Sequence, residues 1–138
     1  PYTTLFRSDP AGYRLWDIAE RQVKQTFDSP FSHSVGVVST SCSGELLAVV
    51  ESKRIRVWNL VSDTQLAELI AGSMKVNIVF SPTEEYLASV SKRATIIIWH
   101  LASNTQVAEL SQNPSSRPLG MGFSPTDRQM CFLLHCSS

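Results

Sequence analysis

The chain has 138 residues, of which 43% are hydrophobic and 17% charged, a composition typical of a globular domain rather than of a disordered segment. The 12 basic and 12 acidic residues cancel, which argues against nucleic acid or an anionic membrane surface as a bulk electrostatic partner. No apolar run approaches the roughly 18 residues of a membrane-spanning helix, and three cysteines do not make a disulfide framework. We therefore expect an intracellular, cytoplasmic protein with no nucleic-acid or membrane partner.

The first eight residues read Pro-Tyr-Thr-Thr-Leu-Phe-Arg-Ser, which resembles the conceptual translation of a common sequencing adapter without a mismatch. Such a segment is set aside in reasoning about a fold, as an expression tag would be. We expect residues 1–8 to be non-native and residues 9–138 to carry the fold.

A short phrase containing tryptophan recurs along the chain. It reads YRLWDI, IRVWNL and IIIWHL at residues 13–18, 55–60 and 96–101. Trp16, Trp58 and Trp99 are therefore 42 and 41 residues apart. A constant period in the low forties indicates a repeat architecture built from one supersecondary unit. Because the three tryptophans occupy the same place in the repeat, we predict that all three are core residues with a structural role.

Each repeat contains short apolar runs, rich in β-branched and aromatic residues and separated by Gly, Ser, Asp or Pro. Runs of this length without a 3.6-residue period indicate strands rather than helices. In the first complete repeat we expect strands at residues 35–40, 46–50, 55–58 and 65–69. In the second we expect them at 76–80, 86–90, 95–99 and 105–110. A further repeat begins with runs at 119–123 and 130–134.

Three sets of residues recur in register through these repeats. They are the dipeptides Trp16-Asp17, Trp58-Asn59 and Trp99-His100, the first-strand exits Phe80-Ser81-Pro82 and Phe123-Ser124-Pro125, and the second-strand residues Leu47-Ala48 and Leu87-Ala88-Ser89. Together they resemble the WD-repeat family. The resemblance implies an all-β fold, a partial WD-repeat-like β-propeller of four-stranded antiparallel blades. Residues 9–138 then hold the end of one blade, two complete blades and the start of a further blade.

About three blades are too few to close a ring, because propellers have about 4 to 8. The terminal blades would expose apolar faces and unpaired strand edges, so we expect the isolated chain to self-associate. A truncated sequence, a fragment completed by further sequence, and an assembly of several short chains all remain open as explanations.

The sequence departs from the family pattern at one polar network. Family blades often carry a Gly-His pair and a hairpin Asp, which form a buried hydrogen-bond network with the tryptophan. His33 fits the histidine position and is assigned a structural role, but Ser32 precedes it in place of glycine. Ser52 and Arg93 stand where the hairpin Asp is expected. We therefore expect an incomplete network and blades that depend mainly on apolar packing.

Two pairs of cations, Lys53-Arg54 and Lys92-Arg93, lie in equivalent hairpins between the second and third strands of successive repeats. Equivalent loops of neighbouring blades project from the same face of a propeller. The four side chains are therefore a candidate site for an acidic or phosphorylated peptide of a partner protein. The alternative is that they are ordinary solvated hairpin residues.

The sequence contains no recognisable catalytic motif. His33, His100 and His135 fall at different places in their repeats, so nothing brings them together. Cys131, His135 and Cys136 do not have the spacing of a common zinc site. We therefore expect no catalytic residue, no metal and no cofactor.

The resemblance implies a non-catalytic scaffold or sensor that binds other proteins on its propeller faces. The alternative is a regulatory WD-repeat domain of a larger enzyme or switch NTPase, with the catalytic part outside this chain. A phosphoinositide-binding propeller would need an Arg-Arg-Gly run, which this sequence lacks. A last alternative is that the sequence is the translation of a sequencing read and does not correspond to a functional protein.

Overall fold

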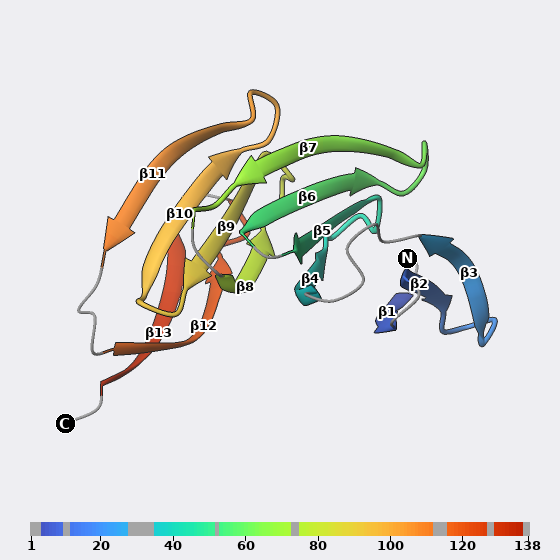
Figure 1. Cartoon of the computed structure of the whole chain (residues 1–138), viewed down its shortest axis with the longest axis horizontal. Coiled ribbons are helices and arrows are strands. Elements are labelled where there is room, and N and C mark those ends of the chain that lie inside the picture. Colours follow the sequence, from blue (N-terminus) through green and yellow to red (C-terminus); the bar gives the residue numbers. More distant parts are fainter. Residues whose placement is uncertain are drawn as a thin grey trace.

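The structure is a computed structural model of the whole chain (Figure 1). It describes residues 4–9, 12–27, 35–51, 53–72, 75–111, 116–126 and 129–136, and the side chains of a smaller set among them. In this described part there are thirteen strands and no helix. The all-β fold class predicted from the sequence is confirmed.

The strands form antiparallel sheets in which neighbours in the sequence are neighbours in space. The first sheet has three strands, β1 (Thr4–Asp9), β2 (Gly12–Asp17) and β3 (Gln22–Phe27). The second has four, β4 (Val35–Thr40), β5 (Leu46–Glu51), β6 (Arg54–Asn59) and β7 (Thr64–Ile70). The third also has four, β8 (Lys75–Phe80), β9 (Tyr86–Ser91), β10 (Thr95–His100) and β11 (Thr105–Ser111). The last is a hairpin of β12 (Ser116–Phe123) and β13 (Met130–Cys136).

The two four-stranded sheets correspond to the two complete repeats of the sequence. Their strand boundaries differ from the predicted ones by at most one residue at either end. The structure adds β1, which overlaps residues 1–8 and pairs along its length with β2. Any sequence that adopts an extended conformation can form such backbone hydrogen bonds, so this pairing does not show that β1 is native. The non-native origin of residues 1–8 therefore stays a prediction.

Equivalent serines close the turns that follow the first strands. The hydroxyls of Ser41, Ser81 and Ser124 each accept a hydrogen bond from the backbone N–H five residues later, at 3.0, 3.0 and 3.1 Å. Each hydroxyl satisfies a backbone donor where the chain reverses direction. The second strands of these three sheets therefore begin in the same way.

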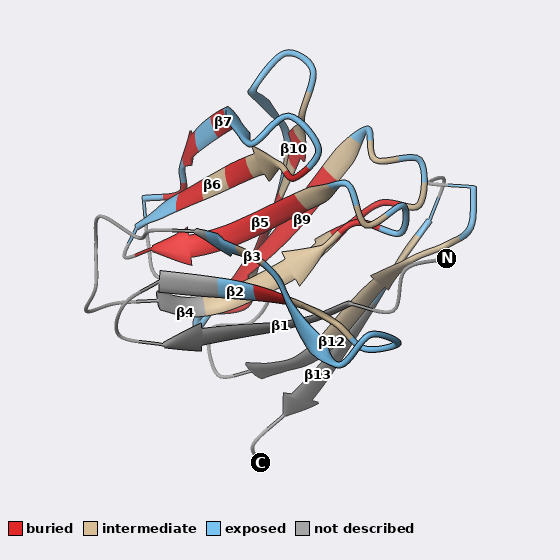
Figure 2. Cartoon of the chain, turned by 90° about the vertical axis from the view of Figure 1, so that its right-hand side faces the viewer, coloured by how far each residue is buried: buried red, intermediate tan, exposed pale blue. Residues whose placement is uncertain are grey.

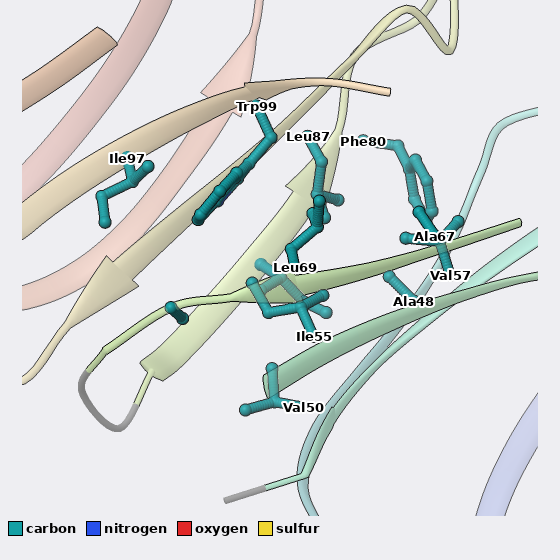
Figure 3. Close-up of a cluster of buried hydrophobic side chains, with 12 residues drawn as sticks. Ala48, Val50, Ile55, Val57, Ala67, Leu69, Phe80, Leu87, Ile97 and Trp99 are labelled. Atoms are coloured by element: carbon teal, nitrogen blue, oxygen red, sulfur yellow. The ribbon is translucent and has the colours of Figure 1, made fainter. Parts of the chain in front are cut away.

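The first strands of successive sheets lie against one another, since β4 contacts β8 and β8 contacts β12. The main core lies between the second and third sheets, where side chains of both interdigitate (Figure 3). Its largest members are Ile55 and Leu69 of the second sheet and Ile78, Phe80, Leu87, Ile97 and Trp99 of the third. Burial is concentrated on β5 and β9 (Figure 2). Apolar packing between two sheets is thus the main stabilising interaction in the described part.

A smaller cluster joins the first sheet to the second. Leu15 of β2 packs there with Leu47, Val49 and Leu60, and Trp58 lies partly buried against them. Trp16 follows Leu15 in the strand and therefore projects from the opposite side of the first sheet.

The three tryptophans differ in burial because they face different neighbours. Trp99 faces a complete four-stranded sheet and is buried, and its indole Nε1 donates to the hydroxyl of Ser89 at 3.3 Å. Trp58 and Trp16 are half-buried. The equivalent residues thus have one place in the repeat but three environments.

Candidate binding groove

Three of the four candidate cations line one groove. Lys53 lies in the turn between β5 and β6, and Lys92 and Arg93 lie in the equivalent turn between β9 and β10. All three border a groove of about 710 Å³ formed by the second and third sheets. The two sheets stack with these turns on the same side, so three cations gather locally although the formal net charge of the chain is zero.

The fourth cation, Arg54, has a different partner. Its Nη1 lies 2.7 Å from Oε1 of Glu68 on the adjacent strand β7, in an exposed ion pair. Arg54 does not border the groove. The structure therefore brings Lys53, Lys92 and Arg93 together and directs Arg54 to Glu68.

The groove combines charge with an apolar surface. Ile70 and Ala71 at the end of β7 and Ile97 of β10 supply apolar side chains. Glu109 of β11 is the one carboxylate among the described lining residues, and its Oε2 accepts a hydrogen bond of 3.1 Å from Nε2 of Gln106. Three cations against one carboxylate leave the groove net positive.

The side chains of the groove are suited to binding a ligand rather than to catalysing a reaction. Lysine and arginine on hairpin turns can pair with carboxylates or phosphates, and an apolar side chain of a ligand can lie on Ile70 and Ile97. Among the described residues no group of three or more His, Cys, Asp or Glu side chains is placed to hold a metal ion. The two thiols that are described, Cys42 and Cys131, are free and exposed.

Sequence reasoning missed Gln106 and Glu109. A signal for Glu109 was present in the repeat. Glu109 is the equivalent of Glu68, and Thr95 stands where the first complete repeat has Arg54, the partner of Glu68. Because the second repeat lacks that arginine, Glu109 instead accepts a hydrogen bond from the side-chain amide of Gln106 at the groove.

The histidines do not extend the site. His33 and the side chain of His135 lie outside the described residues. His100 is half-buried, its Nδ1 is hydrogen-bonded to the hydroxyl of Ser103 at 2.8 Å, and its ring centroid lies 5.5 Å from that of Tyr86. These contacts give His100 a local structural role at the end of β10.

No protein-family model matches this sequence, and no curated protein is similar to it at a significant level. The described residues include no helix that is long and apolar enough to cross a membrane.

Proposed function

We propose that this chain is part of a WD-repeat-like β-propeller that acts as a non-catalytic scaffold or sensor for other proteins. Its groove between the second and third sheets binds an acidic or phosphorylated segment of the partner. The observation that carries the proposal is the convergence of Lys53, Lys92 and Arg93 on one groove with an apolar floor.

The repeat geometry supports the propeller. Two sheets of four antiparallel strands follow each other at an offset of about 41 residues, as blades do. Their first strands and that of the next sheet are in contact in the order β4, β8, β12. Sheets arranged around a common axis with their first strands innermost would make these contacts.

The chemistry of the groove supports an anionic segment. The arginine can form two parallel hydrogen bonds to one carboxylate or phosphate, and the lysines add point charges on flexible stems. Neighbouring blades supply the charges, so one extended segment can reach both turns. Such binding weakens as salt screens the charges.

The test uses a fluorescent octaglutamate peptide as the probe and measures its anisotropy at low salt. Each exposed charge contact contributes about 0.2–1 kcal/mol, so the double variant Lys53→Gln/Lys92→Gln, which removes two contacts, should bind about two- to thirtyfold more weakly. Arg54→Gln is the matched control, because it removes an adjacent cation of the same hairpin that does not border the groove. It should change the affinity less than about twofold.

The same measurement on a peptide with phosphoserines in place of glutamates compares the two anions at one site. If the octaglutamate does not bind, or if the double variant and Arg54→Gln weaken binding equally, the groove is not the site of recognition. In that case the cations are ordinary surface residues.

A further inference from the structure

Glu109 is the one negative charge among the described residues of the groove. Its Oε2 accepts a hydrogen bond of 3.1 Å from Nε2 of Gln106, and among the described residues it forms no ion pair. An ionised carboxylate has about four lone-pair sites, so a single amide leaves most of its capacity as an acceptor unused. The side chain is exposed at the groove and can accept a donor from a ligand.

On the equivalent face of the second sheet, four charged side chains pair within the sheet. Arg54 pairs with Glu68, the equivalent of Glu109, at 2.7 Å. Arg56 pairs with Glu51 at 3.4 Å. The equivalent positions of the third sheet all border the groove, and they are Ser91, Thr95, Ile97 and Glu109. The third sheet thus carries only the carboxylate of this set, without the arginine that pairs with it in the second sheet.

The opposite charges of the groove are separated along β10. Lys92 and Arg93 lie in the turn that leads into β10 at Thr95. Glu109 lies on β11 opposite Ile97, two residues further along β10. A strand rises about 3.3 Å per residue, so the position of Glu109 is roughly 7 Å beyond the start of the strand. The groove is therefore positive at the turns and negative farther along the strand.

An extended ligand has side chains at a matching spacing. Side chains of an extended chain alternate in direction, so residues two positions apart point to one side and lie about 7 Å apart. A ligand whose acidic residue contacts the cations of the turns thus brings the residue two positions away close to Glu109. A lysine or arginine there can form a charge-assisted hydrogen bond with the carboxylate, whereas a second acidic residue would be repelled by it.

We propose that Glu109 makes the groove selective for segments of mixed charge, in which a lysine or arginine stands two positions from the acidic or phosphorylated residue. This selectivity rests on the proposed function, because the acidic residue of the ligand must bind Lys53, Lys92 and Arg93. The ligand class then narrows from acidic segments in general to segments that carry both signs of charge. The cations attract anions, and Glu109 selects among them.

The test measures the fluorescence anisotropy of two labelled dodecapeptides with the full chain at low salt. The mixed-charge peptide has three Glu-Ser-Lys-Ser repeats, so its lysines stand two positions from a glutamate. The acidic peptide has glutamine in place of each lysine. Glu109→Gln should weaken binding of the mixed-charge peptide about 1.5- to fivefold, as expected for the loss of one exposed charge contact. The same variant should tighten binding of the acidic peptide and of octaglutamate, because it removes a repulsive charge.

Glu68→Gln is the matched control, because it removes the equivalent carboxylate of the second sheet, which does not border the groove. It should change the affinity for the mixed-charge peptide less than about 1.5-fold. The net charge of the chain changes by the same amount in both variants, so net charge alone would affect them equally. The two peptides and the two forms of residue 109 make a double-mutant cycle that measures the coupling between Glu109 and the lysines of the ligand. Circular dichroism of both variants checks that the exposed substitutions leave the fold intact.

The outcomes distinguish this selectivity from the proposed function. If octaglutamate binds but Glu109→Gln does not weaken the mixed-charge peptide, the selectivity is overturned and the proposed function stands. Weakening of both dodecapeptides by Glu109→Gln, or equal effects of Glu109→Gln and Glu68→Gln on the mixed-charge peptide, would also overturn it. If neither octaglutamate nor the mixed-charge peptide binds, both proposals fail. Binding of the mixed-charge peptide alone, with weakening by Glu109→Gln, would support the selectivity and exclude purely acidic segments as ligands.

Discussion

Glu84, in the turn between β8 and β9, accepts two hydrogen bonds from Ser43, in the equivalent turn between β4 and β5. The backbone N–H of Ser43 lies 3.1 Å from Oε1 of Glu84, and the hydroxyl of Ser43 donates to the same oxygen. Glu84 has a φ of +66°, in the left-handed region where the equivalent residue Gly44 has +77°. A carboxylate thus links consecutive sheets from a backbone conformation that ordinarily favours glycine.

Replacing Glu84 by glutamine should loosen this link. The amide keeps the size of the side chain but loses the charge that strengthens both hydrogen bonds. Because the pair is partly exposed, we expect a loss of about 0.5–1 kcal/mol in the free energy of unfolding, measured by urea denaturation. Glu85→Gln is the control, since the side chain of Glu85 is exposed in the same turn. Equal losses in the two variants would show that charge at the turn, rather than the contact with Ser43, is responsible.

The same contact should make stability depend on pH. Partial burial raises the pKa of Glu84, but hydrogen bonds from Ser43 and Ser41 outweigh it and hold the pKa below the ordinary value of 4.5. A carboxyl whose pKa is lowered in the folded state stabilises the fold above its unfolded pKa, and this stabilisation is lost as the pH falls through the folded pKa. The difference in stability between the wild type and Glu84→Gln should therefore be constant near neutral pH and shrink below pH 4.5. A difference that stays unchanged in acid would contradict this assignment.

Removing one partner of a buried ion pair on the second sheet should lower the free energy of unfolding. Nε of Arg56 lies 3.4 Å from Oε2 of Glu51, and their side chains are 12% and 5% exposed. Arg56→Met removes the arginine of this pair from beside the buried carboxylate of Glu51 and should cost about 3 kcal/mol. Ser91 and Ile97 stand at the equivalent positions of the next sheet.

The double variant Glu51→Ser/Arg56→Ile, which copies those residues, should therefore be much less destabilised than Arg56→Met. Urea denaturation of the wild type, Glu51→Ser, Arg56→Ile and the double variant measures the coupling between the two sites. Additive losses would mean that the two charges do not stabilise each other.

The tryptophans should differ in their contribution to stability as they differ in burial. Trp99→Ala removes a buried ring and its hydrogen bond to Ser89, and should cost about 3–5 kcal/mol. Trp16→Ala removes a half-buried ring and should cost about half as much or less. The urea midpoints of the two variants give the comparison, and equal losses would show that burial does not control the effect.

The strands could be predicted from the sequence because their signal is local. Apolar runs bounded by turn residues place a strand whatever surrounds it, and repetition at about 41 residues aligns equivalent strands. The burial of Trp16 could not be predicted in this way. It depends on which sheet lies opposite, and the repeat pattern presents all three tryptophans as equivalent.

The groove shows the same limit at the level of single side chains. Periodicity placed Lys53 and Lys92 on one side because equivalent turns of stacked sheets project together. It did not separate Arg54 from them, because its direction depends on Glu68 across the β6–β7 pair. The link between Ser43 and Glu84 joins two turns 41 residues apart and leaves no pattern in either strand.

The residue after the tryptophan should stabilise the turn that follows by accepting hydrogen bonds from its backbone N–H groups. Asn59 provides the test. Its Oδ1 accepts hydrogen bonds from the backbone N–H groups of Val61 and Ser62 at 2.9 and 3.0 Å. At the equivalent position Oδ1 of Asp17 accepts from the N–H of Glu20 at 2.9 Å. Asn59→Ala removes the acceptor for two turn donors and should lower the free energy of unfolding by about 1 kcal/mol.

Asn59→Asp keeps an oxygen in the same place, as the first repeat does, and should stay within about 0.5 kcal/mol of the wild type. Urea denaturation of the two variants separates a requirement for the acceptor from a requirement for the amide. If Asn59→Asp is as destabilised as Asn59→Ala, the amide itself is needed, and the equivalence with Asp17 fails. If neither variant is destabilised, water takes the place of the side-chain oxygen as the hydrogen-bond acceptor. The turn between β6 and β7 is exposed, so its backbone donors can reach solvent.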